Sequence, residues 1–161
     1  MERKSKINSY LDIAQTVATR STCLRRKFGA IIVRDDAIIS TGYNGAPRGR
    51  KNCCDLGTCL RQQMNIPRGE RYELCRSVHA EANAIISASR DLMLNADLYL
   101  VCVDGETGNL VSGTTSCQMC KRQVINAGIA RVIVRESEDE FSVYNVEDWV
   151  TNDDSLGQIG Y

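Results

Sequence analysis

Apolar residues near the start of the chain recur every three or four positions, which is the spacing of one face of an α-helix. They are Ile7, Tyr10, Leu11, Ala14, Val17 and Ala18. We therefore expect an amphipathic helix near residues 6 to 19, lying on the core. Two short runs rich in β-branched residues follow, Phe28 to Val33 and Ala37 to Thr41. With Arg34-Asp35-Asp36 between them, they predict a β-hairpin.

The second half of the chain alternates between helix-forming and strand-forming stretches. An alanine-rich run from His79 to about Arg90 favours a helix. A second helix is expected from Cys117 to about Ala127, because Gly128 is a suitable C-terminal cap. Asp97 to Val103 and Arg131 to Arg135 have the composition of buried strands.

The order of these elements predicts the fold class. Phe141 to Val146 could form a last strand and Glu147 to Val150 a helical turn, and fraying is expected after about Thr151. Helix, hairpin, helix, strand, helix, strand indicates a three-layer α/β/α sandwich, with the two later helices on one side of the sheet. A length of 161 residues suits one domain, 1–161, and is short for two.

One long stretch, at about 43–78, has no regular periodicity. It gathers glycine, proline, charged residues and four of the eight cysteines. A connection this long inside a compact domain is usually functional, held by a metal, or disordered. We therefore treat it as a cysteine-rich insert.

Charge and cysteine content narrow the function classes. Twenty Lys and Arg balance twenty Asp and Glu, so no overall positive field draws the protein to nucleic acid or to an anionic membrane. With no signal-peptide core and no apolar run of transmembrane length, a cytoplasmic location is expected. Cysteines in such a chain favour metal binding or catalysis over disulfides. Cys102, between two valines, is interpreted as a small buried hydrophobe.

The candidate chemistry centres on the only histidine, His79, which has Glu81 two residues later. Cys117 and Cys120 stand three residues apart at the start of a predicted helix, so both sulfurs can face one point. One histidine and two cysteines make three ligands for Zn²⁺ and leave the fourth tetrahedral position open for water, as catalysis requires. Both halves match the H-x-E and C-x-x-C signature of zinc nucleobase deaminases, in which the glutamate is an acid/base and not a ligand.

Glu81 is therefore assigned proton transfer between water, the pyrimidine ring nitrogen N3 and the departing amine. Burial in a closed pocket should raise its pKa. The residue before Cys117 is Ser116, where the usual signature has proline. We expect this serine to cap the helix instead.

The sequence resembles the deoxycytidylate (dCMP) deaminases of the cytidine deaminase superfamily, including the bacterial, archaeal and phage members labelled competence-type. The resemblance spans about Tyr10 to Val134 and rests on four motifs. These are Arg20 to Ala30, Gly42 to Gly49, His79 to Ile85 and Ile125 to Ile129. It implies a mixed five-stranded sheet and a zinc-dependent enzyme that hydrolyses dCMP to dUMP and ammonia, feeding dTMP synthesis. It also implies a homohexamer activated by dCTP and inhibited by dTTP.

The resemblance also implies substrate contacts. Asn44, in the Gly-Tyr-Asn-Gly stretch, carries both a donor and an acceptor and looks like a substrate ligand. For the nucleotide phosphate the candidates are Arg25, Arg26, Lys27 and Arg48, with Arg26 the first choice. The segment from Asp104 to Ser116 is longer than in many relatives, which leaves substrate identity and effector response open.

Four of the other cysteines are candidates for a second, structural zinc. Some relatives place a second zinc in this region, and four thiolates close a tetrahedral site. By position we favour Cys23, Cys53 and Cys75, with Cys59 ahead of Cys54 as the fourth ligand. The alternative is a set of reduced thiols without metal.

Three other functions remain open. The substrate could be another cytosine nucleotide, or the chain could be a tRNA adenosine deaminase that uses the same metal chemistry. It could also be a catalytically silent zinc-binding nucleotide sensor. Glu81 argues against the sensor, because a structural zinc site has no need of that carboxylate, whereas Ser116 keeps it open.

Overall fold

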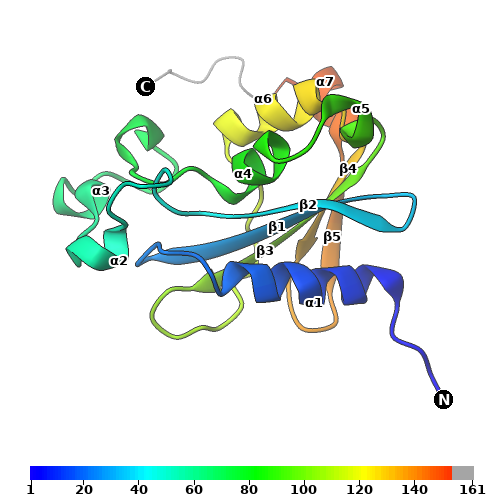
Figure 1. Cartoon of the computed structure of the whole chain (residues 1–161), viewed down its shortest axis with the longest axis horizontal. Coiled ribbons are helices and arrows are strands. Elements are labelled where there is room, and N and C mark those ends of the chain that lie inside the picture. Colours follow the sequence, from blue (N-terminus) through cyan, green and yellow to red (C-terminus); the bar gives the residue numbers. More distant parts are fainter. Residues whose placement is uncertain (154–161) are drawn as a thin grey trace.

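The computed structural model describes residues 1–153, and these form three layers (Figure 1). The central sheet has the strand order β2-β1-β3-β4-β5. Its strands are β1 (Arg26–Arg34), β2 (Ala37–Tyr43), β3 (Asp97–Asp104), β4 (Arg131–Arg135) and β5 (Phe141–Asn145). Only β3 and β4 are parallel, so the sheet is mixed, as expected. The predicted α/β fold with a five-stranded sheet is confirmed.

Helices cover both faces of this sheet. Helix α1 (Lys6–Ala18) crosses one face, and α4 (Ala80–Ile86), α5 (Arg90–Met93), α6 (Gln118–Ala127) and α7 (Val146–Thr151) gather on the other (Figure 1). Alternation along β1 builds the two cores, since successive side chains point to opposite faces. Ala30 and Ile32 pack under α4 and α6, whereas Ile31 and Val33 pack under α1.

The β1–β2 hairpin closes as the sequence predicted. Arg34 pairs with Ala37, which leaves Asp35 and Asp36 as a two-residue loop with φ angles of 51° and 59°. Positive φ at both positions suits the right-handed twist of the flanking strands, and aspartate tolerates it. The hairpin thus sets the sheet edge beside α4.

The predicted helix from His79 to about Arg90 was too long, because α4 ends at Ile86 and α5 begins at Arg90. Ser87 closes α4, and Ser89 is extended as the N-cap of α5, with φ −75° and ψ 147°. Serine competes for backbone hydrogen bonds and so favours helix ends over helix interiors. Alanine content alone did not reveal this break.

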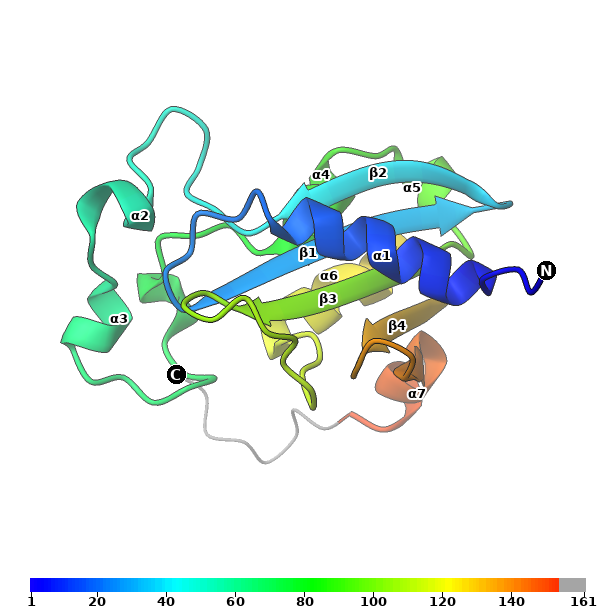
Figure 2. The same ribbon diagram turned by 90° about the horizontal axis from the view of Figure 1, so that it is seen from below.

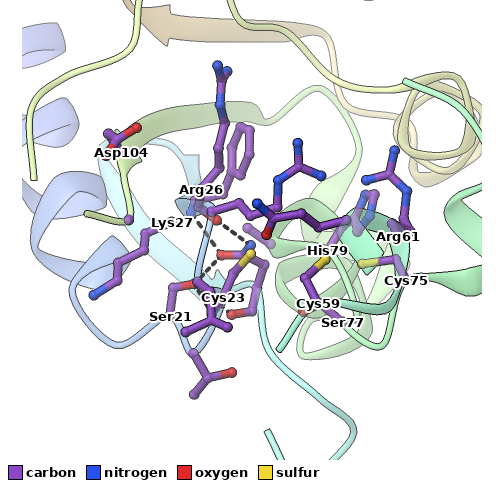
Figure 3. A pocket seen from close by; sticks show the side chains of 18 of the residues that line it. Ser21, Cys23, Arg26, Lys27, Cys59, Arg61, Cys75, Ser77, His79 and Asp104 are labelled. Atoms are coloured by element: carbon purple, nitrogen blue, oxygen red, sulfur yellow. Dashed lines mark hydrogen bonds between the residues drawn. The ribbon is translucent and has the colours of Figure 1, made fainter. Parts of the chain in front are cut away.

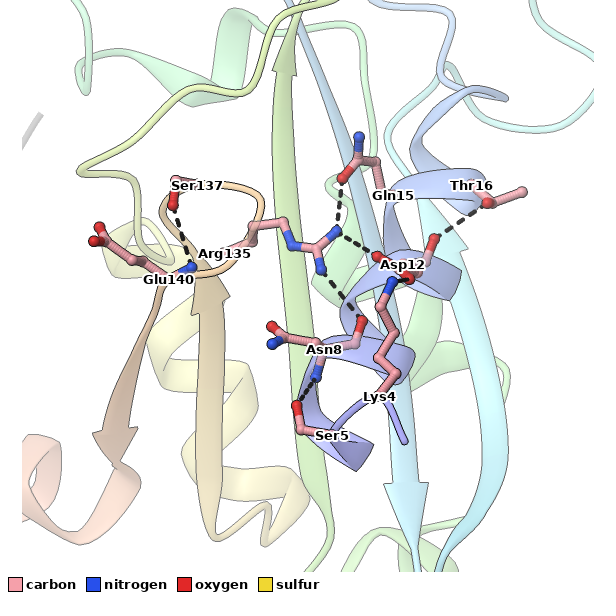
Figure 4. A network of polar contacts seen from close by, with 9 residues as sticks. All are labelled: Lys4, Ser5, Asn8, Asp12, Gln15, Thr16, Arg135, Ser137 and Glu140. Carbon is pink, nitrogen blue, oxygen red and sulfur yellow. Dashed lines mark hydrogen bonds and ion pairs between the residues drawn. The ribbon is translucent and has the colours of Figure 1, made fainter. Parts of the chain in front are cut away.

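Arg135, at the end of β4, fastens α1 to the sheet (Figure 4). Its side chain is 3 % exposed. Nη1 donates to Gln15 Oε1 at 2.9 Å and pairs with Asp12 Oδ1 at 2.9 Å, while Nη2 donates to the Asn8 carbonyl at 3.2 Å. A buried guanidinium paired and hydrogen-bonded in this way offsets much of its desolvation cost.

The cysteine-rich insert lies beyond the end of the sheet where β1 begins and β3 ends (Figure 2). It contains only short elements: α2 (Cys53–Leu56), α3 (Leu60–Gln63) and the 3-10 turn η1 (Tyr72–Leu74). None of the helices within residues 1–153 combines the length and apolar character needed to cross a bilayer. The fraying expected after about Thr151 concerns mainly residues 154–161, which lie outside the described part of the chain.

Candidate metal centre and active site

His79 occupies the N-cap position of α4, and the chain on both sides of it is fixed. Val78 and Gly45 exchange two backbone hydrogen bonds, of 2.8 and 3.2 Å, immediately before the histidine. The His79 carbonyl then accepts from the Asn83 amide at 3.0 Å. The backbone of His79 is therefore held at a defined place at the start of the helix.

The two cysteines sit at the start of α6. Cys117 is the N-cap, and its sulfur accepts from the Cys120 amide at 3.5 Å, which turns both sulfurs toward one point. The expectation that Ser116 caps this helix was wrong, because Cys117 performs that role itself. Ser116 is 2 % exposed and lies beside Glu81, but its hydroxyl makes no hydrogen bond of normal geometry with any residue in 1–153.

The three predicted ligands come together as a metal site. His79 Nδ1 lies 3.5 Å from Cys117 Sγ and 3.4 Å from Cys120 Sγ. Tetrahedral zinc with ordinary Zn–N and Zn–S bonds separates such a pair by about 3.6 Å. Among residues 1–153, this is the only group of three or more candidate ligands whose atoms all lie within 4.8 Å of one another. The donor set and its spacing fit zinc.

The electrostatics of this group also suit a cation. A hydrogen bond from the Cys120 thiol lowers the pKa of Cys117 to about 4, while the same contact raises the pKa of Cys120. The neighbouring Cys117 sulfur raises the pKa of His79 to about 10. A divalent cation that binds such a group replaces the protons held by its imidazole and thiols.

Glu81 follows in the first turn of α4 and is 4 % exposed. Burial raises its pKa, as the sequence led us to expect. It lies against Cys120 and Ser116, so the carboxyl group is beside the ligands without belonging to the set of three. This placement suits a group that moves protons next to a metal.

A cavity of about 820 Å³ opens onto this centre (Figure 3). His79 and Arg61 lie on one side of it, and Asp104, Arg26 and Lys27 lie on the other. Its volume is in the range of small-molecule sites. The irregular insert supplies much of one wall of this cavity.

The predicted substrate ligand Asn44 lines the cavity, but its amide is largely engaged within the protein. Oδ1 accepts from the Ser21 hydroxyl and from the Phe28 amide at 2.8 Å, and Nδ2 donates to the Arg26 carbonyl at 2.9 Å. Asn44 thereby shapes the entry to β1. One N–H of Nδ2 is left for a ligand, so its substrate role stays a prediction.

The cysteines expected at a second zinc are only loosely gathered. The pKa of Cys53 is raised by burial and by the nearby Cys23, Cys59 and Cys75. All eight cysteines lie in the described part of the chain and are free thiols. Their spacing is not that of a closed metal site, since only the His79 group meets the distance stated above within residues 1–153. The second zinc therefore stays a prediction.

Sequence reasoning missed two residues of this wall, Tyr72 and Arg61. The Tyr72 ring lies edge-to-face with the His79 ring, with centroids 5.1 Å apart, and the Arg61 guanidinium stacks on Tyr72 at 4.5 Å. Both come from the segment without periodicity, and no motif marks them. Only the folded chain places them beside the histidine.

Comparison with known proteins shows that the chain is similar to cytidine and deoxycytidylate deaminases. Residues 4–136 match the family described as "Cytidine and deoxycytidylate deaminase zinc-binding region". The chain is 34% identical over 138 residues to the deoxycytidylate deaminase of Mycobacterium phage D29, covering 83% of this chain and 96% of that protein.

It is also 32% identical over 135 residues to the deoxycytidylate deaminase of Schizosaccharomyces pombe, covering 84% of this chain. It spans only 38% of that protein's length, and 42% of the Saccharomyces cerevisiae relative. Among solved structures, the apo dCMP deaminase of cyanophage S-TIM5 is similar, with a TM-score of 0.57 and 26% identity, covering 85% of this chain and 88% of that one.

Proposed function

Because the chain belongs to the family of cytidine and deoxycytidylate deaminases with a zinc-binding region, we propose that it hydrolyses dCMP to dUMP and ammonia. One observation carries the proposal: His79, Cys117 and Cys120 form a zinc-fitting set beside a buried glutamate at the wall of a nucleotide-sized cavity. The phage D29 relative, which this chain covers nearly end to end, bears the name deoxycytidylate deaminase.

Glu81 performs the proton transfers. A zinc ion held by the three ligands would supply a Lewis acid that lowers the pKa of water from about 15.7 to about 7. Glu81 takes a proton from the water that attacks C4 of the cytosine ring and delivers it to N3. It then takes the proton of the hydroxyl group now on C4 and passes it to the amino group, so the C4–N bond breaks, ammonia leaves and the C4 carbonyl of the product forms. A raised pKa suits a carboxyl group that must both accept and donate protons near neutral pH.

Arg26 is the proposed contact for the nucleotide phosphate. It lines the cavity, and its Nη1 is buried without a hydrogen-bond partner among the described residues. A guanidinium with a free donor suits a phosphate group, two of whose oxygens can accept a pair of parallel N–H groups. Asn44 is retained as the proposed contact for the sugar or base edge, through its remaining N–H.

Other features proposed from the family concern the whole protein. We propose one domain, a cytoplasmic location and a homo-oligomer, with a hexamer as the expected size. Activation by dCTP and inhibition by dTTP would require each effector to bind one of two states more tightly. A second zinc at Cys23, Cys53, Cys59 and Cys75 would hold the insert beside the active site.

The test is a deamination assay across cytosine nucleosides and their mono-, di- and triphosphates. The loss of cytosine absorbance and the release of ammonia are followed with and without dCTP and dTTP. We expect the highest kcat/KM for dCMP and opposite effects of the two effectors. A higher kcat/KM for another nucleotide would overturn the substrate, and flat kinetics would overturn the regulation. If the protein deaminates adenosine in a tRNA arm and does not deaminate dCMP, it is a tRNA adenosine deaminase and the proposed function is wrong.

A further inference from the structure

The His79 ring has more freedom than the backbone around it. Backbone hydrogen bonds fix Val78 and the first turn of α4, but they leave both side-chain torsions of the histidine unset. The second torsion of histidine is broad, because it joins tetrahedral and planar carbons. Only some ring orientations aim Nδ1 at Cys117 and Cys120, so something beside the backbone must select them.

Tyr72 is in position to make that selection. Its ring meets the His79 ring at 88° with centroids 5.1 Å apart, which is the edge-to-face arrangement that aromatic pairs prefer. Turning the imidazole about either torsion would break this arrangement. Cys75 shares a hydrogen bond with the imidazole. That bond sets the direction of one ring nitrogen, whereas the Tyr72 ring holds the plane of the imidazole.

Arg61 holds Tyr72 in turn. Its guanidinium stacks over the Tyr72 ring, 4.5 Å from the ring centroid, and Arg61 is only 6 % exposed. Nε donates to the Glu70 carbonyl and Nη2 to the Pro67 carbonyl, both at 3.0 Å. These bonds tie α3 to the loop that leads into η1. A desolvated cation over a tyrosine ring is a strong contact, so the ring is clamped and not merely covered.

We propose that Tyr72, clamped by Arg61, is a positioning residue that pre-sets the His79 ring for zinc. The inference rests on the ligand set of the proposed function and adds a role for the insert, which would orient the histidine from outside the helix that carries it. Pre-orientation removes part of the ordering cost of binding. Hydrogen-bonded partners that orient metal-binding histidines typically change metal affinity by about 10-fold to 100-fold when they are removed, and for a ring contact we take the lower end of that range.

The experiment uses the fact that His79 is the only histidine of the chain. In untagged protein, its ring signals in an NMR spectrum report this centre alone, whatever metal other cysteines hold. The zinc-bound fraction of the His79 signal is followed in competition with a chelator for wild type, Tyr72→Leu and Tyr72→Phe. Met64→Ala is the control, because Met64 is the C-cap residue that follows α3 and is 52% exposed.

We expect Tyr72→Leu to weaken zinc affinity by at least about 10-fold and to shift the ring signals of the zinc-free protein. Tyr72→Phe, which keeps the ring, and Met64→Ala should match wild type. Wild-type affinity in Tyr72→Leu, or an equal loss in Tyr72→Phe or Met64→Ala, would overturn the proposal. If circular dichroism shows that zinc-free Tyr72→Leu is unfolded, the same zinc competition is measured on Arg61→Met. We expect a smaller loss of zinc affinity in that variant, and an unchanged affinity would overturn the proposal.

The outcome is separable from that of the proposed function. If wild-type protein deaminates dCMP and Tyr72→Leu binds zinc with wild-type affinity, only the positioning role of Tyr72 is refuted. If wild-type protein binds zinc but leaves dCMP intact, and Tyr72→Leu has a lower zinc affinity, only the proposed substrate is refuted.

Discussion

Gly42 of β2 packs directly against α4, the helix that carries the proposed zinc ligand His79 and the proposed acid/base Glu81. A Cβ at this position would lie 3.0 Å from the carbonyl carbon of Asn83 and closer still to the Ala80 carbonyl oxygen and the Ala84 amide nitrogen. All three are backbone atoms of α4 and cannot turn aside. In Gly42→Ala the whole helix must therefore move away from the sheet, by at least about half an ångström, because packed interiors leave no slack.

Two consequences follow from that shift. Overpacking should lower the free energy of unfolding by about 1–3 kcal/mol. Activity should fall further than folding does, because displacing a catalytic group by about 1 Å can cost about 100-fold in rate. We expect kcat of the folded Gly42→Ala protein to fall by about 10-fold to 100-fold, measured with dCMP at a temperature where circular dichroism shows the native fold.

Gly29 of β1 supplies a matched control on the opposite face. A Cβ there would lie 2.9 Å from the Ala18 Cα and closer still to the Ala14 carbonyl oxygen, both in α1. Gly29→Ala should cost similar stability, yet it displaces a helix that carries no proposed catalytic group or metal ligand. Equal losses of kcat in the two variants, or an unchanged kcat in Gly42→Ala, would refute the reasoning.

Three other outcomes are expected. Alanine at any of the three zinc ligands should abolish both the zinc of the active centre and deamination, and full zinc occupancy by elemental analysis would refute the ligand set. Metal-replete protein should hold two zinc ions per chain and Cys53→Ser one, whereas a wild-type value of one zinc would count against the structural site. Arg135→Met should lower the free energy of unfolding, measured in urea, by about 2 kcal/mol, because hydrogen bonds to a buried charge are lost. The kcat per folded molecule should not change, and Arg135→Lys should have an intermediate stability. Wild-type stability in Arg135→Met would show that Arg135 does not hold α1 to the sheet.

Elements with a strong periodic pattern were predictable from the sequence. The α1 face, the β1–β2 hairpin and the β3 and β4 strands each repeat apolar residues at the spacing of their own geometry, so pattern and structure agree. The metal centre was equally accessible. The sheet order brings together a histidine and two cysteines that stand at helix starts. The H-x-E and C-x-x-C motifs were enough to identify these residues from the sequence.

Contacts set by tertiary structure were not predictable. Helices α2 and α3 are four residues each, too short to show a periodic pattern. Asn44 looked like a substrate ligand because its side chain is polar and near glycines, yet the fold uses most of that side chain to bind Ser21, Phe28 and Arg26. The stack of Arg61 on Tyr72 joins two positions in the insert with no sequence signal to pair them.

We propose that zinc and Glu81 play separate roles in one deamination site, and the two roles can be separated by a single comparison. Zinc content and dCMP turnover are determined on the same samples of wild type and Glu81→Gln. We expect full zinc at the active centre in both proteins. Turnover in the variant should fall by about 100-fold to 10,000-fold, the range that a positioned acid/base contributes. Turnover near the wild-type rate in zinc-loaded Glu81→Gln would contradict it, as would loss of that zinc when Glu81 is replaced.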